Sequence, residues 1–172
     1  MNRLQSTIIA AALALTVSMS VVTANAAVKE QTIYSNTLQN GWQPWGWATI
    51  DYGNHQTVHP GSASSIAVTV KKGYDALYVH HTAFNTSTFH ALTFWVNGGA
   101  KGGQVLQIQA TANKKPVKYF KLAVLPAHRW IKESIPLSSL GAAGRKDVDG
   151  FWIEDGSGKP LPTFYVDDIE LR

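Results

Sequence analysis

The chain has 172 residues and no cysteine, and 15 basic against 11 acidic side chains give it a net charge of +4. This excess is small and forms no basic run, so the sequence does not support a nucleic-acid partner. The absence of cysteine excludes a disulfide-stapled domain, so a core alone, or a core helped by a metal ion, must hold the fold together. Charged residues make up only 15% of the chain, against about 25% in typical soluble domains. With six Trp, six Tyr and six Phe, this composition favours a binding surface.

Residues 1–26 are predicted to be a secretory signal peptide. Arg3 gives a positive start, an apolar run extends over 8–22, and Ala-Asn-Ala at 24–26 fits the small-x-small cleavage rule. Cleavage leaves residues 27–172 as one domain, which we expect to be monomeric. No later segment offers about 18 consecutive apolar residues, so we expect no membrane span. The predicted location is the periplasm or the extracellular space.

Short runs with period-two alternation, rich in Val, Ile, Thr and aromatic residues, recur between turns built from Gly, Pro and Asn. They predict strands at 29–35, 47–52, 64–70, 76–81, 90–97, 104–111, 117–124, 129–135, 148–154 and 163–171. No window of about 11 residues carries a convincing helical stripe. The sequence therefore predicts an all-β fold, a two-sheet antiparallel β-sandwich.

Alternation along the strands separates an aliphatic face from a face that mixes aromatic rings with amides and acids. The aliphatic set, which we expect to form the core, is Ala48, Ile50, Leu77, Val79, Leu92, Phe94, Val96, Leu106, Ile108, Phe151 and Ile153. The second set is Trp47, Tyr78, His80, Trp95, Gln107, Gln109, Trp152 and Glu154. If the strands are neighbours, this set forms a patch of flat rings that is exposed to water and bordered by hydrogen-bonding groups, which is typical of a binding site. Sugars suit such a patch, because their C–H faces pack on rings and their hydroxyls need fixed polar partners. For any single Trp, half-buried packing under a loop is the alternative.

Three of the six Trp residues lie in one short segment, Trp42-Gln43-Pro44-Trp45-Gly46-Trp47. Pro44 and Gly46 break regular structure, so this segment is predicted to be a loop that enters a strand. We expect Trp42 to lie in the core, where it closes the end of the sandwich, and Trp47 to lie on the aromatic side of its strand. Trp45, at the tip of the loop, is a further candidate ligand-binding residue.

Signals for catalysis are weak, and no catalytic residue is assigned. The sequence has neither the HExxH spacing of zinc proteases nor a GxSxG nucleophile elbow in the right context. One alternative to pure binding is a small polysaccharide lyase or hydrolase that uses His80, Tyr78 and Glu154 as acid and base, since His80 and Tyr78 face the same way. The other alternative is an adhesion module whose aromatic face docks a protein.

The chain ends with two adjacent acids, Asp167 and Asp168, inside an apolar strand. Because neighbouring strand residues face opposite ways, one of the two heads toward the interior, which is costly unless it is compensated. A calcium ion, which takes carboxylate and backbone oxygens, would compensate it. An aspartate that accepts backbone hydrogen bonds at the end of a sandwich is the alternative.

Several motifs resemble the jelly-roll carbohydrate-binding modules that accompany bacterial glycoside hydrolases. They are the Phe-Tyr-Val-Asp-Asp-Ile-Glu-Leu ending at 164–171, the Gly-Trp entry at 41–42, the Val-His-Pro-Gly-Ser turn at 58–62, the Leu-Thr-Phe-Trp-Val strand at 92–96 and Gly-Phe-Trp-Ile at 150–153. Their order along the chain carries the resemblance, which covers essentially all of 30–172. It implies a galactose-binding-like jelly-roll, noncatalytic binding of a polysaccharide or oligosaccharide, and often a structural calcium ion near the first and last strands.

The resemblance also suggests ligands for that calcium ion. In the family pattern an acid of the final pair binds the ion, and Asp168 and Asp167 occupy the matching positions. A partner commonly comes from the loop after the first strand, where this chain has Asn36 in place of the expected acid. The sugar site of the family varies in position, so the aromatic face rests on strand alternation alone.

Overall fold

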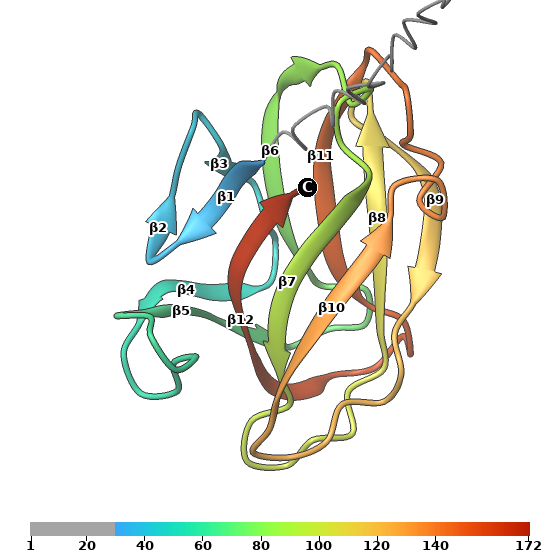
Figure 1. Ribbon diagram of the computed structural model, residues 1–172. Coiled ribbons are helices and arrows are strands. Elements are labelled where there is room, and N and C mark those ends of the chain that lie inside the picture. The colour runs from blue at the N-terminus through green and yellow to red at the C-terminus, as the bar shows by residue number, and fades with distance from the viewer. Residues whose placement is uncertain (1–29) are drawn as a thin grey trace, which may run out of the picture.

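The computed structural model describes residues 30–172, and within this range the chain forms twelve strands in two antiparallel sheets (Figure 1). The predicted signal peptide lies outside the described residues. Over 30–172 no helix is long and apolar enough to cross a bilayer. The two sheets pack face to face as a β-sandwich, as the alternation predicted.

The first sheet has seven strands, and the long last strand organises it. Its members are β1 (Gln31–Ser35), β2 (Thr37–Leu38), β4 (Thr49–Asn54), β5 (Ser65–Val70), β7 (Ala91–Asn97), β10 (Trp130–Pro136) and β12 (Leu161–Leu171). One edge of β12 pairs first with β5 and then with β1, and the other edge pairs with β7. The sheet continues from β7 to β10, from β5 to β4 and from β1 to β2.

The second sheet has five strands in the order β3-β6-β11-β8-β9. They are β3 (Gln43–Pro44), β6 (Ala76–Phe84), β11 (Val148–Asp155), β8 (Leu106–Ala112) and β9 (Lys115–Lys121). In Figure 1, β6, β11 and β8 form the layer behind β12, β7 and β10. The strand β9 is an edge strand, and all of its residues are exposed.

The aliphatic set predicted from alternation fills the space between the sheets. Phe94 of β7 and Ile108 of β8 have no exposed surface, and Phe151 of β11 has almost none. Ala48 and Ile50 are partly buried and pack against this core. Trp42 is also buried and stacks on Phe151 at 6.0 Å, which confirms its predicted place in the core. The hydrophobic effect of this burial replaces the disulfides that the chain lacks.

Candidate functional site

The outer face of the five-stranded sheet carries most of the predicted second set, and strand register explains how. Tyr78 on β6 lies opposite Trp152 on β11, which lies opposite Gln109 on β8. Tyr119 on β9 completes this row. A second row runs across the same strands through Glu154, Gln107 and Lys121, and a third through His80, Gly150 and Thr111. We call this surface, with Trp45 and Trp47 packed on it, the aromatic face.

Trp95 is the exception among the predicted residues. It lies on β7 in the seven-stranded sheet, opposite Asp167 on one side and Lys132 on the other. Its ring stacks on His59, with centroids 4.1 Å apart and planes 24° apart. The expectation that Trp95 lies beside Trp152 is therefore wrong. Alternation fixes the side of a strand on which a residue lies, but it does not say which sheet the strand joins.

Backbone contacts with β6 fix the segment that carries Trp45 and Trp47. The amide of Trp45 donates to the carbonyl of Tyr78, and the amide of Trp47 donates to the carbonyl of Ala76, both at 3.0 Å. Between them, a Cβ on Gly46 would lie 2.3 Å from Ile50 Cδ1 and 2.9 Å from the Ala76 carbonyl oxygen. Glycine at this position lets the loop lie directly on β6, so that both indoles project over the sheet.

The two indoles cover the inner rings of the aromatic face. Trp45 stacks on His80, with centroids 3.5 Å and planes 6° apart, while Trp47 meets Trp152 edge-on at 5.1 Å and 88°. Trp45 and Trp47 are 42% and 46% exposed, whereas Tyr78 and His80 beneath them are 6% and 8% exposed. The expectation that the Tyr78 and His80 rings are open to water is therefore wrong. They support the exposed indoles from below.

Hydrogen bonds hold both exposed indoles in place. Nε1 of Trp47 donates to the carbonyl oxygen of Tyr74 at 2.8 Å. Nε1 of Trp45 donates to Oε1 of Gln43 at 3.1 Å. The Lys114 ammonium lies 5.5 Å from the centroid of the Trp45 ring. A ligand that meets these rings therefore finds them already oriented, which reduces the entropy lost on binding.

Glu154 organises the polar part of the aromatic face. Its Oε2 accepts hydrogen bonds from Nε2 of Gln107 and Nε2 of Gln109, each at 2.6 Å. The carboxylate is nearly buried, while both glutamines are half-buried. Because each amide nitrogen turns toward the carboxylate, each Oε1 is left as a fixed acceptor. The charge strengthens both bonds, since an ionised acceptor roughly doubles the strength of a hydrogen bond.

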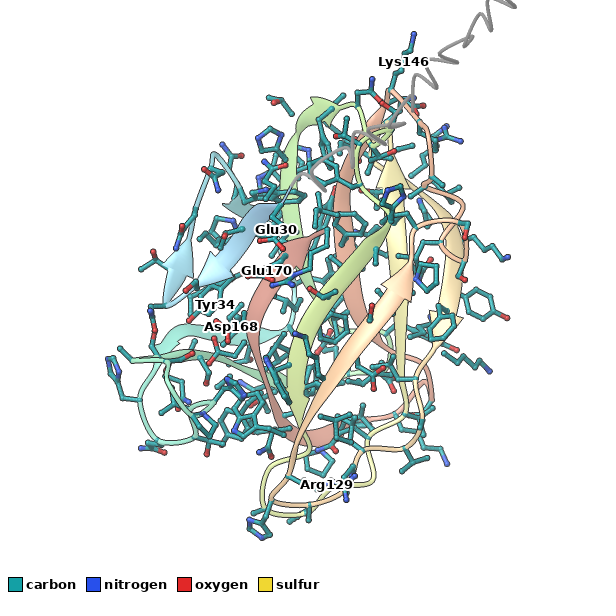
Figure 2. All side chains as sticks on the ribbon, viewed as in Figure 1. Glu30, Tyr34, Arg129, Lys146, Asp168 and Glu170 are labelled. Atoms are coloured by element: carbon teal, nitrogen blue, oxygen red, sulfur yellow. The ribbon has the colours of Figure 1, made fainter. Side chains whose placement is uncertain are left out.

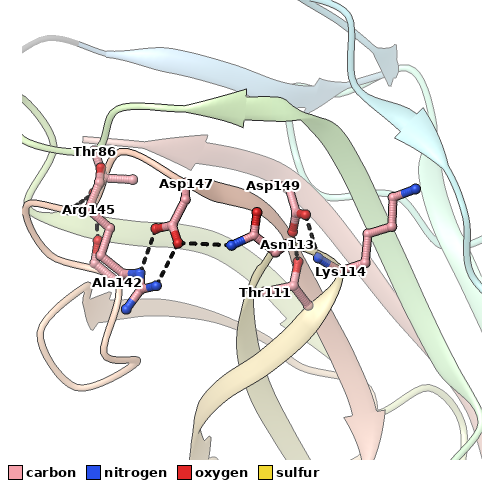
Figure 3. A network of polar contacts seen from close by, with 8 residues as sticks. All are labelled: Thr86, Thr111, Asn113, Lys114, Ala142, Arg145, Asp147 and Asp149. Carbon is pink, nitrogen blue, oxygen red and sulfur yellow. Dashed lines mark hydrogen bonds and ion pairs between the residues drawn. The ribbon is translucent and has the colours of Figure 1, made fainter.

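Hydrogen bonds hold the tyrosine at the centre of the face. The Tyr78 hydroxyl lies 3.2 Å from Oγ1 of Thr111, which donates to Oδ1 of Asp149 at 2.6 Å. The backbone amide of Lys114 donates to the other oxygen of Asp149, and Figure 3 shows Thr111, Asp149 and Lys114 joined in this way. Burial raises the pKa of Tyr78. It also lowers the pKa of His80. Both groups are therefore neutral near pH 7, and the indoles cover both, which is a poor arrangement for an acid–base pair acting on a substrate.

Replacing Gly150 by alanine is expected to destabilise the aromatic face. A Cβ at this position would lie 2.4 Å from Cε2 of Tyr78 and 2.7 Å from the carbonyl oxygen of Val79. Overpacking of this kind typically costs about 1–3 kcal/mol. Urea unfolding of Gly150→Ala should show that loss. In the control Gly53→Ala, the nearest atom to a Cβ is 3.9 Å away, so stability should change by less than about 0.5 kcal/mol. Equal midpoints for the two variants would contradict the close packing under Tyr78.

The structure brings Asp167, Asp168 and Asn36 to one part of the seven-stranded sheet. Asp167 is fully buried, and its Oδ1 accepts the Asp168 amide at 2.8 Å. Asp168 has a positive φ of 46°, and its Oδ2 lies 3.3 Å from Nδ1 of His59. Asn36 Oδ1 accepts the amides of Ala63 and Ser64. Tyr34 and Asp168 lie close together in Figure 2.

These contacts bear on both interpretations of the acidic pair. Burial raises the pKa of the Asp167 carboxyl. A buried carboxylate beside a second one is an environment that a cation relieves. The observed backbone hydrogen bonds to Asp167 are what the alternative predicted. Among residues 30–172, no group of three His, Cys, Asp or Glu side chains is arranged to hold a metal ion. A calcium site here would therefore need amide and backbone oxygens besides the two acids.

Sequence reasoning missed the contribution of β9 to the aromatic face. Tyr119, which is 55% exposed, lies opposite Gln109, and Lys121 lies opposite Gln107. The strand was predicted at 117–124, but both of its faces carry polar and aromatic residues. Alternation therefore did not show which face is turned toward the core. Register against β8 settles the orientation.

The arrangement of the two sheets defines the fold: this chain has the jelly-roll β-sandwich that carbohydrate-binding modules have. The family 11 module of Clostridium thermocellum, in complex with a β-1,3-1,4-mixed-linked tetrasaccharide, has a TM-score of 0.61 and 14% identity over 85% of this chain and 96% of that one. A family 29 module complexed with mannohexaose has a TM-score of 0.58 and 15% identity over 83% and 90%. At these identities the likeness shows the fold.

The chain is also similar in sequence to part of a larger protein. An endoglucanase of Dictyostelium discoideum is 30% identical over 146 residues, which make up 80% of this chain and 20% of that protein. The chain thus spans about a fifth of the length of this curated relative. No family model matches the chain.

Proposed function

We propose that this chain is a noncatalytic carbohydrate-binding module that takes a glycan chain on its aromatic face. The observation that carries the proposal is the pair of exposed indoles, Trp45 and Trp47, fixed by hydrogen bonds beside Trp152 and the two glutamines. Pyranose C–H faces pack on such rings, and the Oε1 atoms of Gln107 and Gln109 accept hydrogen bonds from sugar hydroxyls. The structural neighbours, which include modules solved with oligosaccharides, support this proposal.

The ring planes favour single glycan chains over a crystalline polysaccharide surface. Trp47 stands at 88° to Trp152, which is partly exposed beside it. Rings that are perpendicular to one another do not lie flat together on a planar crystal face. A single chain, whose successive sugars turn relative to one another, meets differently oriented rings in succession. We therefore propose a soluble or amorphous polysaccharide as the ligand.

The absence of catalysis is part of the proposal. Tyr78 and His80 lie under the indoles, and Glu154 is occupied by two amide groups, so none of the three is free to serve as acid or base. The relation to an endoglucanase is consistent with a module that acts beside an enzyme. Export by the signal peptide at 1–26 is likewise proposed, from the sequence pattern.

The test is affinity electrophoresis against soluble polysaccharides, with pull-downs on insoluble ones. We expect retardation by one or more of mixed-linkage β-glucan, glucomannan, xylan and hydroxyethyl cellulose. Binding to crystalline cellulose or chitin should be weak. A reducing-sugar assay on the same panel should show no turnover. Absence of retardation by every polysaccharide would contradict the proposal, and turnover would contradict its noncatalytic part.

We also propose a structural calcium ion held by the carboxylates of Asp167 and Asp168, with Asn36 shaping the neighbouring loop. A ligand that binds only the folded state stabilises it by mass action. Excess calcium is therefore expected to raise the melting temperature by several degrees over that in a chelator. Asp168→Asn should show a smaller rise. Equal melting temperatures in calcium and chelator, with no metal in native mass spectra, would contradict the calcium site. Backbone hydrogen bonds alone would then compensate the buried carboxylate.

A further inference from the structure

The outer face of the seven-stranded sheet carries a depression that is centred on Tyr165 of β12. Three hollows of about 420, 490 and 240 Å³ border this one side chain. The first extends toward Lys101 and Leu161, the second toward Asp51 and His55, and the third toward Asn97 and His128. The aromatic face lies on the opposite side of the sandwich, so this depression is separate from it.

The neighbours of Tyr165 in the sheet leave part of its side chain uncovered. Across the sheet, Tyr165 lies opposite Ala67 on β5 and Asn97 on β7. Asp51 on β4 lies beyond Ala67 in the same row. Ala67 is too short to cover the ring, and Asn97 is held down because its Oδ1 accepts the Gly99 amide at 2.8 Å. An aromatic ring flanked by short or fixed side chains has open space beside it, and the three hollows occupy this space.

Two segments form the walls of the depression. One is the end of β4 with the segment that follows it, which contributes Gly53, Asn54 and residues 55–57. The other is the connection from β7 to β8, where a Cβ on Gly99 would lie 2.5 Å from the Thr163 carbonyl oxygen and 3.2 Å from Cε2 of Tyr165. This connection lies at the lower end of the sandwich in Figure 1. The backbone at Gly99 thus rests against Tyr165 and fixes the edge of the site.

The lining supplies free hydrogen-bonding groups of both kinds. Among residues 30–172, neither Asp51 nor Lys101 takes part in an ion pair. Asp51 uses one oxygen to accept the Gly53 amide, and Lys101 is exposed at the opposite hollow. An acceptor on one side of the ring and a donor on the other match a ligand whose hydroxyls surround an apolar ring face. They do not match a lipid or an apolar peptide.

We propose that this depression is a second saccharide site, which takes a short glycan segment with one pyranose packed on Tyr165. Asp51 accepts hydroxyl protons of that sugar and Lys101 donates to its oxygens. The site goes beyond the binding proposed for the aromatic face and shares no residue with it. One aromatic ring gives less stacking than two, so the second site is the weaker of the two.

The test is an NMR titration of ¹⁵N-labelled protein with cellotriose, mannotriose and xylotriose in separate experiments. With at least one of them, the amides of Ala67, Thr163 and Ala100 should shift saturably at millimolar sugar. Tyr165→Ala should abolish these shifts, and Tyr165→Phe, which keeps the ring, should retain them. The double variant Trp45→Ala, Trp47→Ala should also retain them. Melting curves of each variant confirm folding.

Two outcomes would overturn the second site. One is the absence of saturable shifts around Tyr165 with all three sugars. The other is shifts of equal size in the parent and in Tyr165→Ala. The indole resonances of Trp45 and Trp47, followed in the same spectra, report on the aromatic face alone. Their behaviour therefore separates failure of the second site from failure of the proposed function.

Discussion

Replacing Trp47 by alanine is expected to weaken glycan binding about thirtyfold, which corresponds to about 2 kcal/mol at a central aromatic contact. The indole is nearly half exposed, is fixed by its bond to the Tyr74 carbonyl, and stands beside Trp152. Its removal takes away one wall against which a sugar packs. Isothermal titration calorimetry with the best-binding oligosaccharide measures the change. Trp45→Ala should lower affinity as well, by removing the second exposed ring.

The matched control deletes the same side chain on the opposite sheet. Trp95 lies beside His59 and Lys132, away from the aromatic face. Trp95→Ala should therefore bind the oligosaccharide like the parent. Thermal unfolding of all three variants shows whether each remains folded. Parent-like affinity in both Trp47→Ala and Trp45→Ala would contradict the assignment of the aromatic face.

Replacing Glu154 by glutamine is expected to weaken binding about fivefold, which corresponds to about 1 kcal/mol. A neutral amide of the same shape gives up the charge assistance of both bonds to Gln107 and Gln109. Both bonds go to Oε2, so the amide oxygen can take that position and accept both, but without the negative charge. The two glutamines are then held less firmly, while the rings stay in place. Calorimetry on the same oligosaccharide measures this smaller loss.

The same variant separates binding from catalysis. If Glu154 orients the glutamines, Glu154→Gln changes affinity and the parent shows no turnover. If Glu154 is an acid or base, the parent degrades the polysaccharide and the variant does not. Affinity equal to that of the parent would mean that the glutamine amides do not meet the ligand.

The alternation of residue types along each strand was sufficient to predict the fold, because each sheet buries one of its faces and the buried face is aliphatic. All ten predicted ranges overlap observed strands, and Leu92, Phe94 and Val96 lie in the core as alternation required. The two strands that were not predicted, β2 and β3, have two residues each, which is too short for any alternation to show. They form through pairing with β1 and β6, which is a tertiary effect.

Which residues form the candidate site was harder to predict from the sequence. Tyr78, Trp152 and Gln109 do share a row, but Trp95 belongs to the other sheet, and strand order is decided by long-range pairing that alternation does not encode. The packing of Trp45 on His80 depends on how the loop around Gly46 folds back on β6. Which rings are exposed therefore became clear only from the structure.

The most direct test of the binding proposal is a crystal structure with an oligosaccharide from the best-binding polysaccharide. The account predicts a pyranose ring packed on Trp47 or Trp45, with a hydroxyl within hydrogen-bonding distance of Oε1 of Gln107 or Gln109. A glycan held only by the loops at the end of the sandwich, with both indoles bare, would contradict it.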